Sequence, residues 1–460
     1  MTASSAPTGE GAVPQQLDRG MGLLQATATN IIGMVGVGPF LTIPLMVSSM
    51  NGPHILYAWI AGAALALSDG LVYAQLGAAL PGSGGPYLYV REAYKPFGLG
   101  RLMAFLFIFQ VILVAPLSIA GGAVGFANYL QFYWTTMTPL EGQLVAAAVS
   151  GAMTALLYRD IESVGRLTVI MLAVVLVTVG WVLAAGFVTF SPRQAFDFPP
   201  EAYRFDRRLF GHLGATAMLA MYSYGGYNQV CNIGEEIRNP ARTLPRSIVL
   251  SIVVVALLYI GLGTVIVGLM PWRDVARTNT IASVFIEKTF SDPEHGRVAG
   301  IVMTGLILFV AASSLYALIL GYSRIPFAAA RNGDFFRVFA RVHPTKHFPY
   351  VSLLTVGAIS LPFCFFTLGQ LVSWLIQVQI LMQFLWQCAG VILLTALRTD
   401  IPQPFRMWFY PAPAIVSGLL WLYIFVTGPR EGMYFSFAFL ALAVAAYGAF
   451  AMRRARQGLA

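Results

Sequence analysis

The chain has 460 residues, of which 58% are hydrophobic and 10% charged, and its mean hydropathy is +0.73. Soluble proteins carry about 25% charged residues, so this chain lacks the polar surface that a water-soluble fold needs, and lipid must be its solvent over much of its area. The net charge of +9 comes from scattered arginines and not from a basic block with interleaved aromatics, which argues against nucleic-acid binding. The composition therefore predicts an all-α membrane protein.

The chain opens with polar sequence. Residues 1–20 have no charged start followed by an apolar core, so we expect a disordered cytoplasmic tail and not a signal peptide. After it, apolar stretches of about 20 residues recur, each long enough to cross a hydrocarbon core of ~30 Å. We predict about twelve transmembrane helices, near 22–47, 54–80, 102–130, 142–158, 165–190, 210–234, 246–270, 298–330, 350–367, 371–397, 409–427 and 432–452.

The loops between these spans carry an asymmetric charge. Most of the 28 basic residues fall in the loops that share a side with the N-terminus, whereas the acidic residues divide evenly. Cytoplasmic loops carry the excess of Arg and Lys in membrane proteins. We therefore expect an integral, multi-pass protein of the plasma membrane with both termini in the cytoplasm.

The first predicted span contains a cluster of helix-breaking residues, Gly33-Met34-Val35-Gly36-Val37-Gly38-Pro39-Phe40. Proline removes a backbone donor, and glycine tolerates unwound geometry. In a bilayer such a break is tolerated only where the backbone is buried in protein or lines a wet cavity. The amides freed here begin a second half-helix, whose positive end favours an anion. The alternative is a close-packing face between helices.

A second cluster lies midway through the sixth span, Tyr222-Ser223-Tyr224-Gly225-Gly226-Tyr227-Asn228. Unwinding here would free carbonyl oxygens, which suit an ammonium group. An aromatic belt at the membrane interface is the alternative. Because spans 1 and 6 hold corresponding positions in two five-span halves, the two breaks match the central site of many secondary transporters. Amides at one break and carbonyls at the other suit a zwitterion, an amino acid.

Five blocks of the sequence resemble the amino acid–polyamine–organocation superfamily of permeases. Gly36-Val37-Gly38-Pro39-Phe40 is similar to that family's Gly-Ser-Gly-Ile-Phe signature, and the run from Tyr222 to Arg246 resembles the span 6 region of the L-type amino acid transporters. The other blocks are GAALPGSGGPYLYVREAY, SSLYALILGYSRIPFAAARNGDFF and PQPFRMWFYPAPA. The resemblance implies a LeuT-like core of ten helices in two inverted repeats with broken spans 1 and 6 (21–397), helices 11 and 12 (398–452), and a basic cytoplasmic tail (453–460).

The resemblance also implies site residues. In the family, the amides of the span 1 signature hold the substrate carboxylate, here Gly36, Val37 and Gly38. The span 6 carbonyls hold the amino group, here Tyr222, Ser223 and Gly225, and Tyr224 and Tyr227 would flank or gate the pocket.

Three departures from the family pattern bear on where span 1 restarts as a helix and on how transport is coupled. Pro39 replaces the usual Ile, and the span 5 stretch has no Lys to stand in for a bound cation. The place near the end of span 2 where the family often has Glu looks like Gln75, whereas an acid occurs earlier, at Asp69. A carboxylate inside a span is a functional hypothesis by default. Asp69 could carry a coupling proton, attract a cationic amine, or be a structural acid bonded to neighbouring helices.

Other candidates are weaker. Glu235 ends span 6 and could form an inner gate with Arg91 or Arg166, or simply belong to a cluster of ion pairs at a helix end. We expect no metal site, no cofactor and no enzymatic activity. Animal L-type transporters join a glycoprotein through a Cys after span 3; the loop 131–143 here has no Cys, so we expect no disulfide-linked heavy chain.

The sequence thus predicts a secondary active permease that moves amino acids across the cytoplasmic membrane, by proton coupling or by exchange. A polyamine or organic-cation permease of the same superfamily remains the alternative.

Overall fold

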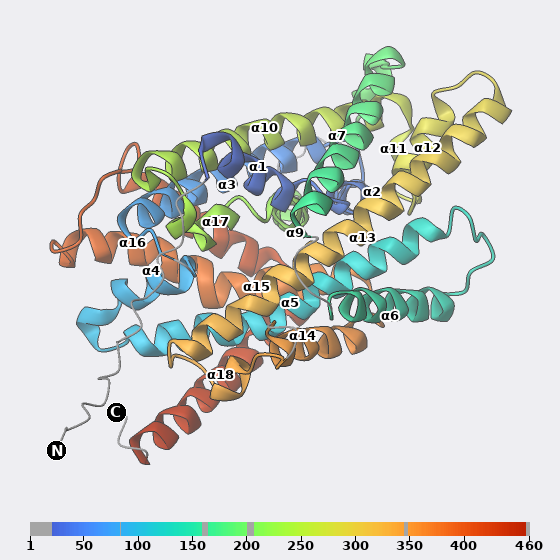
Figure 1. Cartoon of the computed structure of the whole chain (residues 1–460). Coiled ribbons are helices and arrows are strands. Elements are labelled where there is room, and N and C mark those ends of the chain that lie inside the picture. The colour runs from blue at the N-terminus through green and yellow to red at the C-terminus, as the bar shows by residue number, and fades with distance from the viewer. Residues whose placement is uncertain (1–20, 83, 159–163, 200–206, 345–347, 457–460) are drawn as a thin grey trace, which may run out of the picture.

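The computed structural model describes residues 21–82, 84–158, 164–199, 207–344 and 348–456. The tail expected at 1–20 lies outside the described residues. The described part is helical apart from one isolated bridge between Met21 and Ile237. Its α-helices are α1 Leu23–Met34, α2 Gly38–Met50, α3 Ile55–Ala79, α4 Pro86–Ala93, α5 Gly100–Leu130, α6 Pro139–Leu156, α7 Val164–Val188, α8 Pro192–Ala195, α9 Arg207–Tyr224, α10 Pro240–Leu269, α11 Trp272–Val275, α12 Ile281–Lys288, α13 Pro293–Arg331, α14 Tyr350–Phe363, α15 Leu368–Gln379, α16 Leu385–Leu397, α17 Ala412–Thr427 and α18 Arg430–Arg456 (Figure 1).

Six helices of the described residues are long and apolar enough to cross a membrane: α3, α5, α10, α13, the continuous helix Leu368–Leu397, and α18. The pair α1 and α2 passes the same test as one span, bent by 47° at its break. Shorter apolar helices lie at Ala173–Val188, Tyr350–Phe363 and Ala412–Thr427. The prediction of an all-helical, multi-pass membrane protein is confirmed.

The helix breaks fall where glycine and proline cluster. α1 ends at Met34, Val35 turns to an extended conformation, and α2 begins at Gly38 with Pro39 in its first turn, the position where proline costs no hydrogen bond. α9 ends at Tyr224, and the chain continues through Gly226 (φ +115°) into two short 3-10 turns, Gln229–Asn232 and Gly234–Glu236. Both breaks predicted from the sequence are therefore present.

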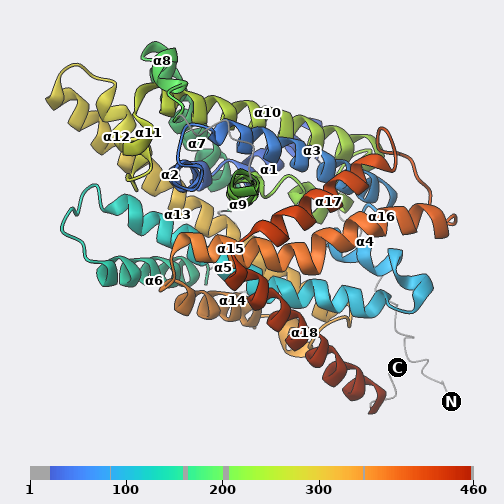
Figure 2. The ribbon, with the colours of Figure 1, turned by 180° about the vertical axis from the view of Figure 1, so that it is seen from behind.

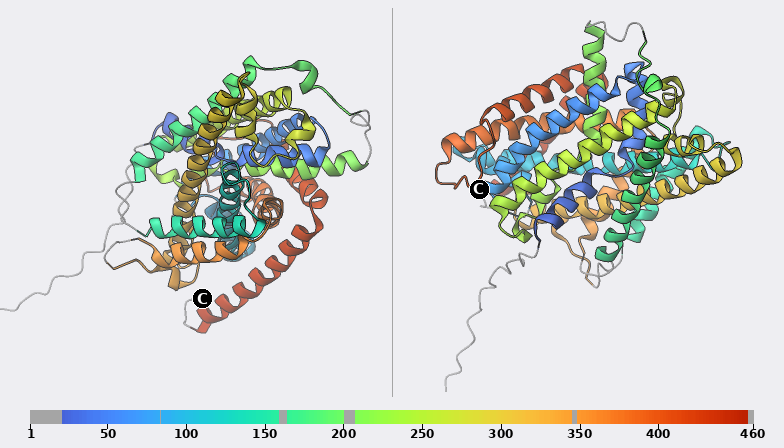
Figure 3. Two further views of the ribbon diagram at one scale, coloured as in Figure 1. Left: turned by 90° about the vertical axis from the view of Figure 1, so that its right-hand side faces the viewer. Right: turned by 90° about the horizontal axis from the view of Figure 1, so that it is seen from above.

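The bundle is built from helix pairs that pack along their length. α3 packs on α10, α5 on α13, α6 on α14, and α2 on α9. Figure 2 shows α2 and α9 next to each other inside the bundle, with α17 crossing nearby. In contrast, α18 runs along the edge of the bundle, where it contacts α15 and α5 (Figure 3). α18 also continues to Arg456, so the basic residues Arg453, Arg454 and Arg456 extend a membrane helix.

One span changes its winding at mid-length. Between α15 and α16, residues Ile380–Phe384 form a single π-helical turn. π-turns are rare and often occur at functional sites. This turn directs Gln383 to the Tyr73 hydroxyl at 2.7 Å and to Gln110, whose Nε2 donates to Gln383 Oε1 at 2.6 Å. The turn thus joins α3 and α5 through buried polar groups.

Candidate functional site

The break in the first span leaves two backbone donors without a backbone partner. The Gly36 amide bonds back to the Met34 carbonyl at 3.1 Å. Among the backbone hydrogen bonds of the described residues, none is donated by Val37 or Gly38. These two amides lie at the beginning of α2, where the helix dipole favours a negative group. They are two of the three amides predicted to hold a carboxylate.

The break in the sixth span is held against the first by a glycine pair. A Cβ on Gly226 would lie 2.6 Å from the carbonyl carbon and oxygen of Gly33, so only glycine permits this approach. Gly33 and Gly225 both remain exposed to solvent, although Met34 and Tyr224 beside them are buried. Among the backbone bonds of the described chain outside its helices, none ends on the carbonyl of Tyr222 or Gly225. The carbonyl of the exposed Gly225 is therefore an acceptor that no such backbone bond occupies.

Tyr259 of α10 ties the two breaks together. Its hydroxyl lies 2.7 Å from the Met34 carbonyl oxygen and 3.1 Å from the Ser223 carbonyl oxygen. Met34 ends α1, and Ser223 is one of the predicted ammonium ligands. Tyr259 is fully buried, so this hydroxyl is an internal donor to the carbonyls that the breaks release.

Side chains from three helices complete the surroundings of the breaks. Thr42 of α2 and Ser223 of α9 share a hydrogen bond of 2.9 Å between their hydroxyls. The Ser314 hydroxyl of α13 lies 3.0 Å from the position that a Cβ on Gly36 would take, and the Tyr222 hydroxyl lies at the same distance from the corresponding point on Gly121 of α5. The predicted residues of spans 1 and 6 are thus brought together, with α5 and α13 as further walls.

The two tyrosines predicted to flank or gate the pocket are both buried. Tyr224 is fully buried, donates to the Trp59 carbonyl at 3.2 Å, and packs against the rings of Trp59 and Tyr259. Tyr227 is also buried; its ring meets the Tyr73 ring edge-on. Neither side chain reaches solvent in this conformation.

Asp69 is the centre of a buried hydrogen-bond network. Its carboxylate accepts from the Tyr227 hydroxyl at 2.5 Å, from Trp421 Nε1 at 3.1 Å and from the Cys388 thiol at 3.6 Å. These donors come from the broken span 6, α17 and α16. Asp69 has no solvent exposure, and a buried carboxylate is tolerated when donors satisfy its oxygens. The network connects the break in span 6 to α16, in the tenth predicted span, and to α17, in the eleventh.

On the face where α4 lies, the expected partner of Arg91 differs from the observed one. Arg91 pairs with Asp334 at 3.1 Å, just after α13, and lies 3.8 Å from Glu92. Burial raises the pKa of the Asp334 carboxyl, which the nearby arginines oppose. Glu235 is exposed, and the side chain of Arg166 lies outside the described residues. The pairing of Glu235 with Arg91 is therefore not found, and the gating role of Glu235 stays a prediction.

Ion pairs and backbone bonds close the same face. Arg398 donates to Glu92 at 2.9 Å and to Asp400 at 2.8 Å, which fixes α4 to the end of α16. The hydrogen bond from the Arg398 guanidinium lowers the pKa of the Asp400 carboxyl. The Gly84 amide donates to the Asn232 carbonyl, and Met21 pairs with both neighbours of Ile237. The 3-10 part of span 6 is thus held from two sides.

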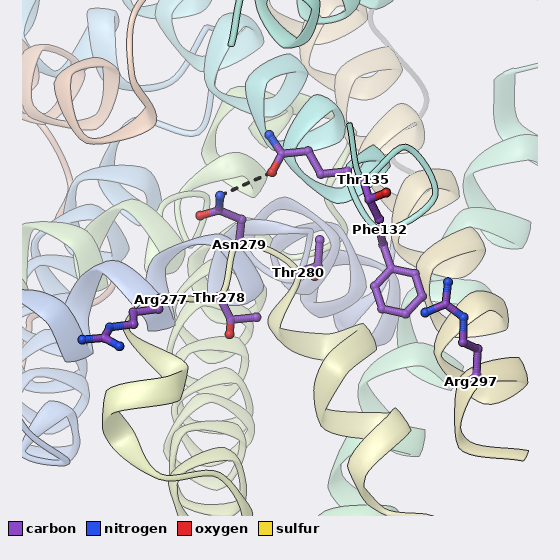
Figure 4. A pocket seen from close by; sticks show the side chains of 8 residues that line it. Phe132, Thr135, Arg277, Thr278, Asn279, Thr280 and Arg297 are labelled. Carbon is purple, nitrogen blue, oxygen red and sulfur yellow. Dashed lines mark hydrogen bonds between the residues drawn. The ribbon is translucent and has the colours of Figure 1, made fainter. Parts of the chain in front are cut away.

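A polar pocket of about 380 Å³ opens at the other end of the bundle (Figure 4). Tyr129 precedes the lining residue Gln131 by two positions: its hydroxyl accepts from the Ala282 amide of α12 at 3.2 Å and lies 3.5 Å from the Phe40 carbonyl of α2. Phe40 is two residues beyond Gly38. Tyr129 thus links α12 to α2 near this pocket, whose lining residues are Gln131, Phe132, Thr135, Arg277, Thr278, Asn279, Thr280 and Arg297.

Comparison with known proteins decides the family. A family model described as amino acid permease matches residues 21–448. The chain belongs to the amino acid permease family. The resemblance drawn from the five sequence blocks is confirmed, and the permease is a transporter and not an enzyme.

Relatives of this permease differ in what they carry. It is 26% identical to the branched-chain amino acid permease of Bacillus subtilis, over 89% of this chain and 87% of the relative. It is 30% identical to an uncharacterized transporter of Mycobacterium tuberculosis, over 75% of this chain and 74% of that protein. The large neutral amino acids transporter small subunit 2 of Rattus norvegicus is 26% identical, over 92% and 79%.

Sequence reasoning missed the residues that support the permease's breaks from other helices. Tyr259, Thr42 and Ser314 are polar residues in apolar helices, and such residues usually bond within their own helix. Trp421 lies 352 positions from the carboxylate that it contacts. The one available signal was Asp69, because a carboxylate inside a membrane span needs hydrogen-bond donors from neighbouring helices.

Proposed function

We propose that this permease moves amino acids by binding the zwitterion between its two broken helices. The observation that carries the proposal is that the two breaks lie together and that, among the backbone bonds of the described residues outside the helices, none is donated by Val37 or Gly38. The Val37 and Gly38 amides would hold the carboxylate, with the Gly36 amide available on rearrangement. The carbonyls of Tyr222, Ser223 and Gly225 would hold the ammonium group. Tyr224 and Tyr227 would act from behind, by fixing the span 6 backbone.

The side chain of the substrate is proposed to be uncharged. Of the described residues, Asp69 is the one buried Asp, Glu, Lys or Arg, and protein donors already occupy both of its carboxylate oxygens. A cationic or anionic side chain would therefore meet no opposite charge near the breaks, and burying an unpaired charge is costly. The same occupancy disfavours the polyamine alternative, which needs a free carboxylate.

The proposed architecture is a LeuT-like core of two inverted five-helix repeats with two further helices, twelve spans in all. The packing supports it: the second, third and fourth helices of one half each pack on their counterparts in the other half, α3 on α10, α5 on α13 and α6 on α14. The broken helices meet as well, α2 on α9. A two-fold relation places equivalent elements together in this way. Both termini are proposed to be cytoplasmic, in the plasma membrane.

A competition panel in proteoliposomes tests the substrate. Uptake of a labelled branched-chain amino acid should be inhibited by other neutral amino acids and much less by lysine, glutamate, putrescine or spermidine. The panel distinguishes an amino acid permease from a polyamine permease, because inhibition by putrescine alone would favour the polyamine permease. If no amino acid competes and none raises the unfolding temperature of the purified protein, the proposal is wrong.

Proton coupling is proposed to involve Asp69, since its network reaches the substrate break through Tyr227. An Asp69→Asn variant should retain exchange between labelled and unlabelled substrate but lose the dependence of net uptake on an imposed pH gradient. Asp274→Asn, in the short helix α11, is the matched control. Equal responses of wild type and Asp69→Asn to the gradient would assign Asp69 a structural role.

A further inference from the structure

The polar pocket of about 380 Å³ is lined by three segments: the turn after α5, the loop between α11 and α12, and the beginning of α13. Figure 4 shows Thr280 in the middle, with Arg277 on one side and Arg297 on the other. Both arginines are exposed, whereas the Thr280 side chain is buried. None of the residues proposed to bind the zwitterion lines this pocket.

The loop that leads into α12 has three consecutive amides without an acceptor. Among the backbone hydrogen bonds of the described residues, none is donated by Asn279, Thr280 or Ile281. Ile281 is fully buried and is the first residue of α12. A buried amide needs a partner, which is a protein group, an ordered water or a bound ion. The described part of the protein supplies none for Ile281, so the partner comes from solution.

The hydroxyl of Thr280 is a further donor beside these amides. Thr280 is the residue before α12, where a threonine commonly accepts a hydrogen bond from the first turn, but it makes no such bond. The amides that it would accept from are taken: Ala282 donates to the Tyr129 hydroxyl and Ser283 to the Thr280 carbonyl. The Thr280 side chain is 8% exposed and lines the pocket. Its hydroxyl is therefore open to a ligand.

The charge of this pocket is positive. Its lining contains Arg277 and Arg297 but no Asp or Glu. Neither arginine takes part in an ion pair among the described residues, and the acid on the neighbouring short helix, Asp274, pairs with Lys288 at 3.4 Å. The Arg297 guanidinium lies 5.9 Å from the centroid of the Phe132 ring, which also lines the pocket. The positive end of the α12 dipole adds to this charge.

We propose that this pocket binds a small monovalent anion, such as chloride or acetate, through the Thr280 hydroxyl and the amides of Thr280 and Ile281, with Arg277 and Arg297 supplying positive charge. Successive backbone amides that lead into a helix are a recurrent anion site. An amino acid is not the ligand, because the lining has no carboxylate to pair with its ammonium group. A water molecule would satisfy the donors but would gain nothing from the charge.

The anion would also fix the first turn of α12 to its neighbours. Asn279 already donates to Gln131 at 3.4 Å, the dashed line in Figure 4, which ties the loop to the end of α5. The amide that follows Ile281 meets the Tyr129 hydroxyl, and that hydroxyl lies 3.5 Å from the Phe40 carbonyl of α2. An anion that occupies the donors before this turn therefore stabilises the contact between α12 and the second half of the broken span.

Thermal unfolding of the full-length protein in detergent tests the site, with chloride or acetate titrated into gluconate buffer at constant ionic strength. For wild type, the unfolding temperature should rise and saturate, as expected for a ligand of the folded state. Thr280→Val, Arg277→Gln and Arg297→Gln should each weaken the apparent affinity about three- to fivefold, because each removes one hydrogen bond or one charge. Thr280→Ser keeps the hydroxyl and should keep the affinity. Arg273→Gln, exposed but outside the lining, is the charge-matched control and should change nothing.

The proposal is overturned if wild type unfolds at one temperature in gluconate, chloride and acetate, or if Arg273→Gln weakens binding as much as Arg297→Gln. A response to only one of the two anions would identify that anion as the ligand. Crystals of wild type soaked in bromide do not depend on how the variants fold. An anomalous peak is expected within hydrogen-bond distance of the Thr280 hydroxyl, and its absence there would refute the site. Neither readout involves amino acid transport.

Discussion

The contact between Gly33 and Gly226 makes a sharp prediction, because both backbones approach closely at one point. Gly226 has φ +115°, a conformation that side chains rarely adopt, and its added Cβ would lie 2.6 Å from the Gly33 carbonyl. The atoms that it meets belong to the backbone and cannot rotate away. Gly226→Ala should therefore push the two broken helices apart.

The magnitude follows from two separate costs. Holding an alanine at this φ costs about 1–3 kcal/mol, and forcing a methyl group into a packed contact costs about 1–3 kcal/mol more. The sum, about 2–6 kcal/mol, acts on the closed arrangement of the breaks. Since 1.4 kcal/mol corresponds to a factor of ten, substrate affinity at the breaks should fall at least about tenfold.

A series of three glycine variants separates this effect from a general loss of stability. Gly33→Ala should be milder, because its Cβ meets the Gln229 side chain at 2.9 Å and the Gly226 carbonyl only at 3.3 Å. Gly321→Ala is the matched control, since a Cβ there meets nothing within 4 Å. The measurements are the unfolding temperature in detergent and the KM of uptake in proteoliposomes. The reasoning is refuted if Gly226→Ala transports with the wild-type KM, or if Gly321→Ala is as harmful as Gly226→Ala.

Three further predictions concern hydrogen bonds and ion pairs. Tyr259→Phe removes the hydroxyl between the two breaks and should slow uptake about tenfold, since an unsatisfied buried carbonyl costs about 1–3 kcal/mol; Tyr224→Phe, which frees only one carbonyl away from the breaks, should cost less in the same uptake assay. Trp421→Phe keeps an aromatic ring but deletes a donor to the buried Asp69 carboxylate, and should destabilise the protein by about 1.5–3 kcal/mol in thermal unfolding. The loss of stability should be smaller when Trp421→Phe is made in the Asp69→Asn variant. An equal loss in both backgrounds would contradict the contact. Arg398→Gln should lower the unfolding temperature near pH 7 but not near pH 3. The pKa of Asp400 is lowered in the folded protein. The ion pair therefore stabilises the fold above the pKa of Asp400 in the unfolded chain, and its contribution disappears as the pH falls through the pKa of Asp400 in the folded protein. A pH-independent difference would rule out the ion pair as its cause.

The sequence located the two breaks because glycine and proline act locally. Gly36, Gly38 and Pro39 disrupt any helix that contains them, and the pair Gly225–Gly226 does the same in the sixth span, so no tertiary information was needed. The apolar ranges likewise followed from the thickness of the bilayer. The family followed from five sequence blocks, two of which contain these breaks.

What the sequence could not give are contacts made across the bundle. The donors to Asp69 come from α16, α17 and the span 6 break, and no local pattern connects them. The sequence offered Arg91 or Arg166 as a partner for Glu235, and the structure pairs Arg91 with Asp334 because α13 ends beside α4. The π-turn at Ile380–Phe384 has no glycine or proline to announce it. Such features depend on which helix lies next to which.

The Tyr259 hydroxyl has one proton and two carbonyl oxygens within reach. At any instant it can satisfy only one of them well, so the empty transporter always lacks one hydrogen bond at the junction of its broken helices. An ammonium group, with three donors, would end that shortage. The empty protein thus lacks a hydrogen bond at the point where its substrate is proposed to bind. An amino acid that supplies this bond would change the contacts of α1, α9 and α10 at the same time.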